Sequence, residues 1–395
     1  MPAASVRQTY RNVALLALCQ GFLLTNGVTL VAVNGLVGLR LADDPRLATL
    51  PLTAYVLGAA LTTLPAAFLM KHRGRRFGFV TGSGLGIVGA LLGALAVWLG
   101  SFWLLCLGTM FSGSYNAFGQ QYRFAAADAA DLSLKGKAIA LTLAGGILGG
   151  VIGPELSKHT RELLQPTFVA TYASLAVFAF ISMLLVSRLQ IPPLSISEQH
   201  APGRSMREIA RQPAFIVAVL AAACGYGVMN LLMTATPIAM DMCQHPFADT
   251  AFVLEWHVIG MFAPSFFTGT LIRRFGLVKV LATGALLMFA CIATALAGTS
   301  VMHFWWALLL LGVGWNFLYI GGTTLLTETY RPAEKAKVQG SNDLMVFAVQ
   351  GITSLSSGAL ITRAGWETLN YWALPAVSLT ALATALWRLT VARRQ

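Results

Sequence analysis

The sequence predicts an all-α membrane protein with twelve transmembrane helices in two pseudo-symmetric halves of six helices each. Of the 395 residues, 56% are hydrophobic and only 11% are charged, whereas soluble domains carry about 25% charged residues. Apolar runs of about twenty residues recur from one end of the chain to the other, as membrane-spanning helices require. Residues of the first half also recur about 200 positions later, which indicates an internal repeat.

The apolar runs define the spans. Arg7 and Arg11 precede the first run, but no small-residue cleavage site follows it, so we expect no removable signal peptide. No soluble domain of any size fits between the runs. We expect spans near residues 13–37, 51–70, 77–99, 102–122, 136–157, 166–187, 213–238, 250–272, 276–298, 302–325, 336–360 and 367–388.

The basic residues indicate the orientation. Cytoplasmic loops of membrane proteins are enriched in Lys and Arg. With both termini in the cytoplasm, most of the 27 Lys and Arg residues fall on cytoplasmic segments, and the turn at residues 240–245 lies outside. This distribution explains the net charge of +12 without a nucleic-acid partner. The basic residues left outside are Arg40, Arg46, Lys158, Arg161 and Arg363.

The repeat divides the chain into an N-terminal half, residues 1–187, and a C-terminal half, residues 213–395. A polar, basic cytoplasmic loop at residues 188–212 links them, and its end, S-M-R-E-I-A-R, predicts a short interfacial helix. Asn116, Asp128, Lys135 and Lys137 of the first half match Asn316, Glu328, Lys335 and Lys337 of the second.

Two parallel six-helix halves resemble the architecture of the major facilitator superfamily. The basic turns after spans two and eight, K-H-R-G-R-R-F-G and I-R-R-F-G, also resemble its loop signature. They depart from that signature because Lys71 and Arg273 replace its acidic residue. The usual charge relay of this loop therefore lacks its acidic member here.

A candidate metal site lies on spans seven and eight of the second half. Met229 and Met233 are four residues apart, as are His257 and Met261, so each pair lies on one helix face. If the spans are antiparallel, Met233 and His257 lie roughly 12 Å from the turn along the helix axes, and the other two roughly 19 Å. Thioether and imidazole are soft ligands that suit copper, above all Cu(I), rather than Mg or Ca.

Packing is the alternative interpretation of the methionines, because Met fills irregular gaps in a core. A histidine inside a span is costly and marks a functional site by default. The matching positions of the first half are Thr25, Thr29, Gly58 and Thr62, so this ligand set exists only in the second half. A second cluster comprises Met240, Met242, Cys243 and His245. It is either an ordinary polar turn or an outer capture site through which a soft metal enters.

Of the acidic residues, Glu255 and Asp343 lie within or near the spans and are the candidates for proton coupling. The sequence contains no Walker A loop, G-x-S-x-G or H-E-x-x-H pattern, so neither ATP hydrolysis nor another enzymatic activity is expected. The five scattered Cys residues show neither a disulfide framework nor zinc-finger spacing.

The pattern M-x-x-x-M in span seven followed by H-x-x-x-M in span eight resembles the bacterial CcoA-like copper importers of the same superfamily. The resemblance implies that Met229, Met233, His257 and Met261 bind copper. It also implies import across the bacterial inner membrane by alternating access, to supply copper for haem–copper cytochrome oxidase assembly. The implied partners are the copper ion, the lipid bilayer and copper chaperones, with no permanent cofactor and no nucleic acid.

Two other functions stay open. The first is a drug or metabolite antiporter of the same superfamily, in which the methionines line an apolar pocket for a small organic molecule. The second is a metal receptor that passes copper to a partner without transporting it.

Overall fold

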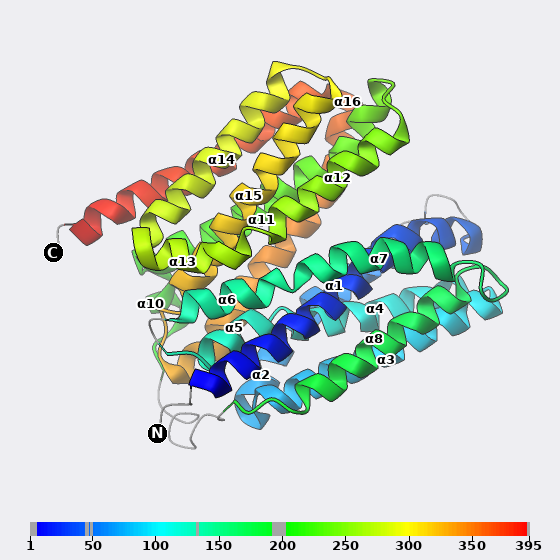
Figure 1. Ribbon diagram of the computed structural model, residues 1–395, viewed down its shortest axis with the longest axis horizontal. Coiled ribbons are helices and arrows are strands. Elements are labelled where there is room, and N and C mark those ends of the chain that lie inside the picture. Colours follow the sequence, from blue (N-terminus) through cyan, green and yellow to red (C-terminus); the bar gives the residue numbers. More distant parts are fainter. Residues whose placement is uncertain (1–5, 44–46, 48–49, 132–133, 192–202, 393–395) are drawn as a thin grey trace. The chain divides into compact units, whose positions relative to one another are not determined.

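The computed structural model describes residues 6–43, 47, 50–131, 134–191 and 203–392. Within these ranges the regular elements are helices and no strand occurs (Figure 1). Nine of the described helices are long and apolar enough to span a membrane, and a bent pair provides a tenth span. The expected spans 102–122 and 336–360 are helical too, but their polar and glycine residues make them less apolar. Residues 192–202 of the central loop, and Arg46, lie outside the described ranges.

The chain forms two units. Unit 1 comprises Met1–Ala130, Gly145–Pro202 and Lys335–Leu344. Its helices are α1 (Val6–Leu41), α2 (Leu50–Arg73), α3 (Arg75–Leu99), α4 (Phe102–Gly119), α5 (Tyr122–Asp128), α7 (Gly146–Thr160) and α8 (Val169–Val186). Within the unit, α1 packs along α7, and α4 packs along both α2 and α3.

Glycine lets α2 and α4 approach closely. A Cβ added to Gly113 of α4 would lie 1.9 Å from the carbonyl oxygen of Tyr55 in α2. A Cβ added to Gly58 of α2 would lie 2.1 Å from the carbonyl oxygen of Met110. Small residues commonly line helix contacts in membranes, because backbones must approach closely for dispersion contacts to form.

Unit 2 comprises Asp131–Ala144, Gly203–Glu334 and Met345–Gln395. Its central helix is α15 (Val301–Leu326), because α11, α12 and α14 all pack along it. The last long helix changes direction at Gly365, where φ is 78°. The helices are α6 (Lys135–Ala144), α10 (Met206–Ala210), α11 (Pro213–Met242), α12 (Phe247–Phe262), α13 (Ser265–Phe275), α14 (Leu277–Ala297), α15 (Val301–Leu326), the 3-10 turn η3 (Pro332–Glu334) and α16 (Lys335–Ala392), whose first ten residues belong to unit 1.

The two units thus exchange short helical segments that the internal repeat relates. The segment at the start of span five, α6, belongs to unit 2, whereas α7 of the same span belongs to unit 1. The start of span eleven belongs to unit 1, where Lys335 pairs with Asp128 at 2.8 Å. Lys135 and Lys335 are the matching residues of the repeat. Sequence order alone therefore does not define the packing units.

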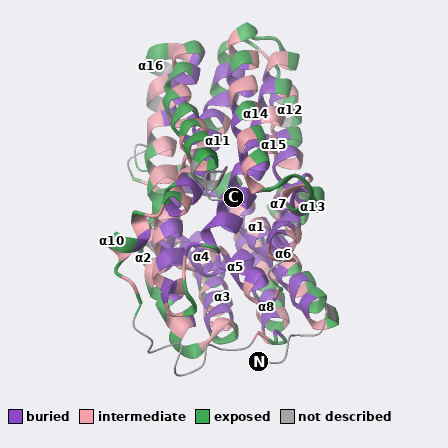
Figure 2. Cartoon of the chain, turned by 90° about the vertical axis from the view of Figure 1, so that its left-hand side faces the viewer, coloured by how far each residue is buried: buried purple, intermediate pink, exposed green. Residues whose placement is uncertain are grey.

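Many residues along the helices are exposed (Figure 2), and a large share of them are big apolar residues. Leu286 of α14 is 66% exposed, Ile352 of α16 is 65% exposed and Trp372 of the same helix is 64% exposed. Such residues are normally solvated by lipid in a membrane protein, where the backbone hydrogen bonds are satisfied inside each helix.

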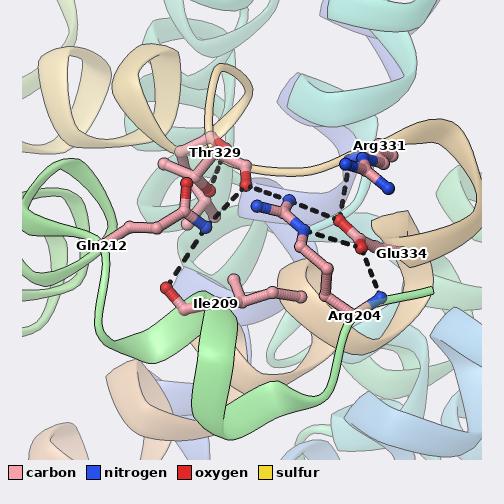
Figure 3. Close-up of polar contacts among 7 residues, drawn as sticks. Arg204, Ile209, Gln212, Thr329, Arg331 and Glu334 are labelled. Carbon is pink, nitrogen blue, oxygen red and sulfur yellow. Dashed lines mark hydrogen bonds and ion pairs between the residues drawn. The ribbon is translucent and has the colours of Figure 1, made fainter.

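The end of the central loop is held against unit 2 by an ion pair (Figure 3). Arg204 donates to both carboxylate oxygens of Glu334, at 3.0 and 2.7 Å, and to the carbonyl oxygen of Thr329 at 2.9 Å. Gln212 donates to the same carbonyl oxygen at 3.0 Å. The hydrogen bonds from Arg204 lower the pKa of Glu334 to about 2 despite its burial. We call this cluster of Arg204, Gln212, Thr329 and Glu334 the loop anchor.

Candidate transport site

The two candidate methionine ligands of span seven lie in the middle of α11. Met229 is buried, at 4% exposure, and Met233 is half-buried. The helix is continuous from Pro213 to Met242, so the spacing of four residues places both on one face as expected.

His257 of α12 is fully buried and hydrogen-bonded to a neighbouring helix. Its Nδ1 lies 2.7 Å from the carbonyl oxygen of Leu308 in α15, so Nδ1 carries the proton in this contact. The other ring nitrogen, Nε2, is buried and has no hydrogen-bond partner within the described residues. The bond to Leu308 by itself explains why an imidazole is stable here, and Nε2 keeps an unused lone pair.

The two candidate ligand pairs are arranged around α15. Both α11 and α12 pack along α15, while α11 and α12 contact each other only sparsely. Gly312 of α15 sits against the backbone of His257 and Met261. Among the described side chains, no group of three or more His, Cys, Asp or Glu residues is placed to hold a metal ion. Methionine sulfur is a further possible ligand, and the set Met229, Met233, His257 and Met261 stays a prediction.

Asn316 of α15 stabilises the break between α12 and α13. Pro264 at the break has no backbone N–H, and the two helices are bent by 41°. Asn316 donates to the carbonyl oxygen of Met261 and to Ser265 Oγ, both at 2.6 Å, and accepts from Thr268 Oγ1 at 2.7 Å. One buried amide therefore satisfies the polar groups that the break frees, which explains an asparagine inside an apolar helix.

The four residues of the expected outer capture site differ in burial and in their contacts. Met240 is fully buried, whereas Met242 is 57% exposed. His245 uses its Nε2 in a contact of 2.7 Å with the carbonyl oxygen of Thr299, and Cys243 is half-buried. This arrangement fits a turn fixed to the start of α15, and the capture role stays a prediction.

An aromatic cluster that the sequence analysis did not single out lies between α11, α12 and α15. Trp315 and Tyr319 stack at 4.9 Å with 19° between their planes. Tyr226 makes T-shaped contacts with both, at 5.5 and 5.4 Å, and Phe262 makes another with Trp315 at 5.8 Å. The spacing of four residues between Trp315 and Tyr319 is the sequence signal that could have indicated it. We call these four residues the aromatic cluster.

Of the two candidate proton carriers, Asp343 is buried and Glu255 is exposed. Asp343 forms an ion pair with Arg123, and the two side chains are 2% and 1% exposed. Gln121 and Asn342 also donate to its carboxylate, at 2.7 and 3.1 Å. The sequence placed Arg123 among the basic residues of the cytoplasmic segments and did not predict that its side chain is buried.

A second ionic cluster in unit 1 surrounds Asp128. Arg75 lies 3.1 Å from one carboxylate oxygen and Lys335 lies 2.8 Å from the other. Burial raises the pKa of Asp128, but the charges of Arg75 and Lys335 outweigh that effect and hold the pKa below its ordinary value. Arg75 also donates to Gln339 at 2.6 Å. Asp128 thus supplies the acidic partner that the loop after span two lacks.

Comparisons with known proteins cover nearly the whole chain. A model of the Major Facilitator Superfamily matches residues 14–254 and 247–395. The riboflavin transporter RfnT of Brucella anthropi is 39% identical over 379 residues, which is 95% of each chain. The uncharacterized MFS-type transporter YddS of Bacillus subtilis is 27% identical over 378 residues, covering 90% of this chain and 86% of its own.

Solved transporters share the fold at low sequence identity. The transporter FucP, in its outward conformation, aligns with a TM-score of 0.78 at 19% identity, covering 95% of this chain and 98% of its own. A bacterial homologue of the iron transporter ferroportin aligns with a TM-score of 0.73 at 14% identity, covering 95% and 99%. At such identities the likeness extends to the fold alone and does not choose a substrate.

Proposed function

The chain belongs to the Major Facilitator Superfamily, and we propose that it imports riboflavin or a closely related flavin across the bacterial inner membrane. The observation that carries the proposal is the match to a riboflavin transporter along almost the whole length of both chains. The superfamily and the all-helical fold expected from the sequence are confirmed, as is a multi-pass membrane protein of the transporter type.

The comparisons favour the small-organic-molecule alternative over copper import. The resemblance to CcoA-like copper importers finds no support among them, and neither does a role in cytochrome oxidase assembly. The pattern M-x-x-x-M followed by H-x-x-x-M does not by itself distinguish copper binding from packing. Met pairs four residues apart also serve packing, and the hydrogen bond to Leu308 accounts for His257 without a metal.

Transport by this superfamily exposes one binding site alternately to the two sides of the membrane. In this chain, we take Asp343 as the residue that couples transport to protons. Its carboxylate is buried against Arg123, so binding a proton would cancel the charge attraction that holds the start of α16 in unit 1. An exposed carboxylate such as Glu255 would exert no comparable force.

Copper import is the second candidate, because one observation favours it. The Nε2 atom of His257 is buried without a hydrogen-bond partner in the described structure, and a soft metal would use its lone pair. Met261, one turn away on the same helix, is buried as well. The two candidates predict different cargo, so one uptake experiment distinguishes them.

The test uses a bacterial riboflavin auxotroph that lacks its own flavin importer. Cells expressing the protein should grow at riboflavin concentrations too low for cells with the empty vector, and should accumulate radiolabelled riboflavin. Parallel uptake of radiolabelled copper should equal that of the vector control. Copper accumulation with riboflavin uptake at the control level would reverse the order of the two candidates.

A further inference from the structure

One face of α11 carries a stripe of half-buried residues. Tyr226, Asn230, Met233 and Pro237 follow one another at spacings of four, three and four residues, so they lie above one another on the helix. We infer that Tyr226 and Asn230 form the subsite that recognises the isoalloxazine ring of the flavin. The inference rests on the proposed function, and it assigns the ring-binding role to two residues on one helix.

Tyr226 is suited to stacking because the aromatic cluster holds its ring in place. Trp315 and Tyr319 contact it at 5.5 and 5.4 Å, and both are only 2% exposed, so they form a rigid support. Tyr226 itself is half-buried, so part of its side chain is accessible. A ring that is already immobilised loses little conformational entropy when a planar ligand stacks on it.

Asn230 is suited to reading the polar edge of the ring because its amide group is oriented by α16. Its Nδ2 donates to the carbonyl oxygen of Gln350 and to Thr353 Oγ1, both at 3.2 Å. Both amide hydrogens are therefore used within unit 2, and what the side chain offers a ligand is its oxygen, an acceptor.

The chemistry of the flavin matches this pair. The oxidised isoalloxazine ring is a planar aromatic system with one N–H donor, at N3, on its polar edge. Asn230 lies one turn from Tyr226 on the same face, which places an acceptor beside a stacking surface. The inference is that the N3–H donates to the oxygen of Asn230 while the ring stacks on Tyr226.

The test compares riboflavin with 3-methylriboflavin, in which a methyl group replaces the N3 hydrogen. Both compete with radiolabelled riboflavin for uptake into cells that express the protein. The wild type should bind the methylated analogue roughly tenfold or more weakly, since a site built to accept a hydrogen bond rejects a ligand that lacks the donor. Asn230→Leu should weaken riboflavin and leave the analogue nearly unchanged, so that the selectivity falls close to one.

Tyr226 should behave differently from Asn230. Tyr226→Leu should weaken both ligands by a similar factor, roughly tenfold, because stacking does not depend on N3. Tyr226→Phe, which keeps an aromatic ring for stacking, should weaken both ligands less than Tyr226→Leu does. Amounts of each variant in the membrane are measured in parallel, and Asn230→Ala, which also removes the amide oxygen, replaces Asn230→Leu if the latter fails to insert.

Two outcomes would overturn the inference and are distinguishable. If the wild type takes up riboflavin but the Asn230 variants at normal membrane levels keep its selectivity, the subsite assignment is wrong and the proposed function stands. If the wild type takes up no riboflavin, the proposed function fails and the subsite fails with it.

Discussion

Asp343→Asn should strongly destabilise unit 1. The substitution keeps the size of the side chain and removes its charge, which leaves the guanidinium of Arg123 buried without a counter-ion. Both side chains are at least 98% buried, so water cannot replace the lost partner. Removing one member of a buried ion pair costs about 3–5 kcal/mol, which corresponds to a loss of roughly two to four orders of magnitude in the folding equilibrium. The contact of Arg123 with Gln120, at 2.8 Å, offsets part of this cost and favours the lower end.

The assay is urea-induced unfolding of the purified protein in mild detergent micelles, monitored by tryptophan fluorescence. The double variant Arg123→Met/Asp343→Leu removes both charges and should recover most of the stability, because apolar residues of similar volume fill the same space. Glu162→Gln is the matched control, since it breaks an ion pair with Arg161 whose side chains are 50% and 71% exposed. Exposed pairs contribute under about 1 kcal/mol.

The reasoning would be refuted in either of two ways. The first is unfolding of Asp343→Asn at the same urea concentration as the Glu162→Gln control, which would mean that the ion pair is solvated in the native protein. The second is a double variant less stable than both single variants, which would mean that the pair contributes net stability beyond its desolvation cost.

Three further predictions follow from the geometry. Glu334→Gln should release the loop anchor and speed tryptic cleavage after Arg204 at neutral pH. In the wild type, the stabilisation from the ionised carboxylate of Glu334 should be lost as the pH falls from 4.5 through about 2, so pepsin cleavage of this loop should rise over that range. His257→Gln, which keeps a donor for Leu308, should leave riboflavin uptake near the wild-type rate, whereas a large loss at normal protein levels would show that His257 takes part in flavin transport. Gly113→Val should abolish accumulation in the membrane because even a Cβ would overlap α2, while Gly84→Val, with open space at its Cβ, should accumulate normally in the same immunoblot.

The helical architecture was predictable because it depends on local properties. Apolar runs of sufficient length and basic residues at their ends define spans without knowledge of which helices touch. The repeat also singled out Asn316 and Lys335 before any contact was known, and both take part in buried or half-buried polar interactions. Polar residues that recur in the two halves therefore predicted positions that form polar contacts inside the fold.

The pairing of helices was not predictable in the same way. Spacing along a helix shows which residues share a face but not which helix lies opposite that face. The copper hypothesis placed its ligand pairs at matched depth on two consecutive spans, whereas in the structure both spans pack along α15 and contact each other only sparsely. For the same reason Arg123 and Asp343, 220 residues apart, could not be paired from the sequence. The exchange of α6 and the start of α16 between the units is a property of the whole fold as well.

The proposed transport of a flavin is tested by uptake of riboflavin into proteoliposomes. Purified protein is reconstituted into liposomes loaded with unlabelled riboflavin, and radiolabelled riboflavin is added outside. We expect saturable accumulation of label by exchange, absent from protein-free liposomes and suppressed by excess external riboflavin but not by copper. Accumulation of radiolabelled copper by the same liposomes, with riboflavin label at the protein-free level, would contradict it.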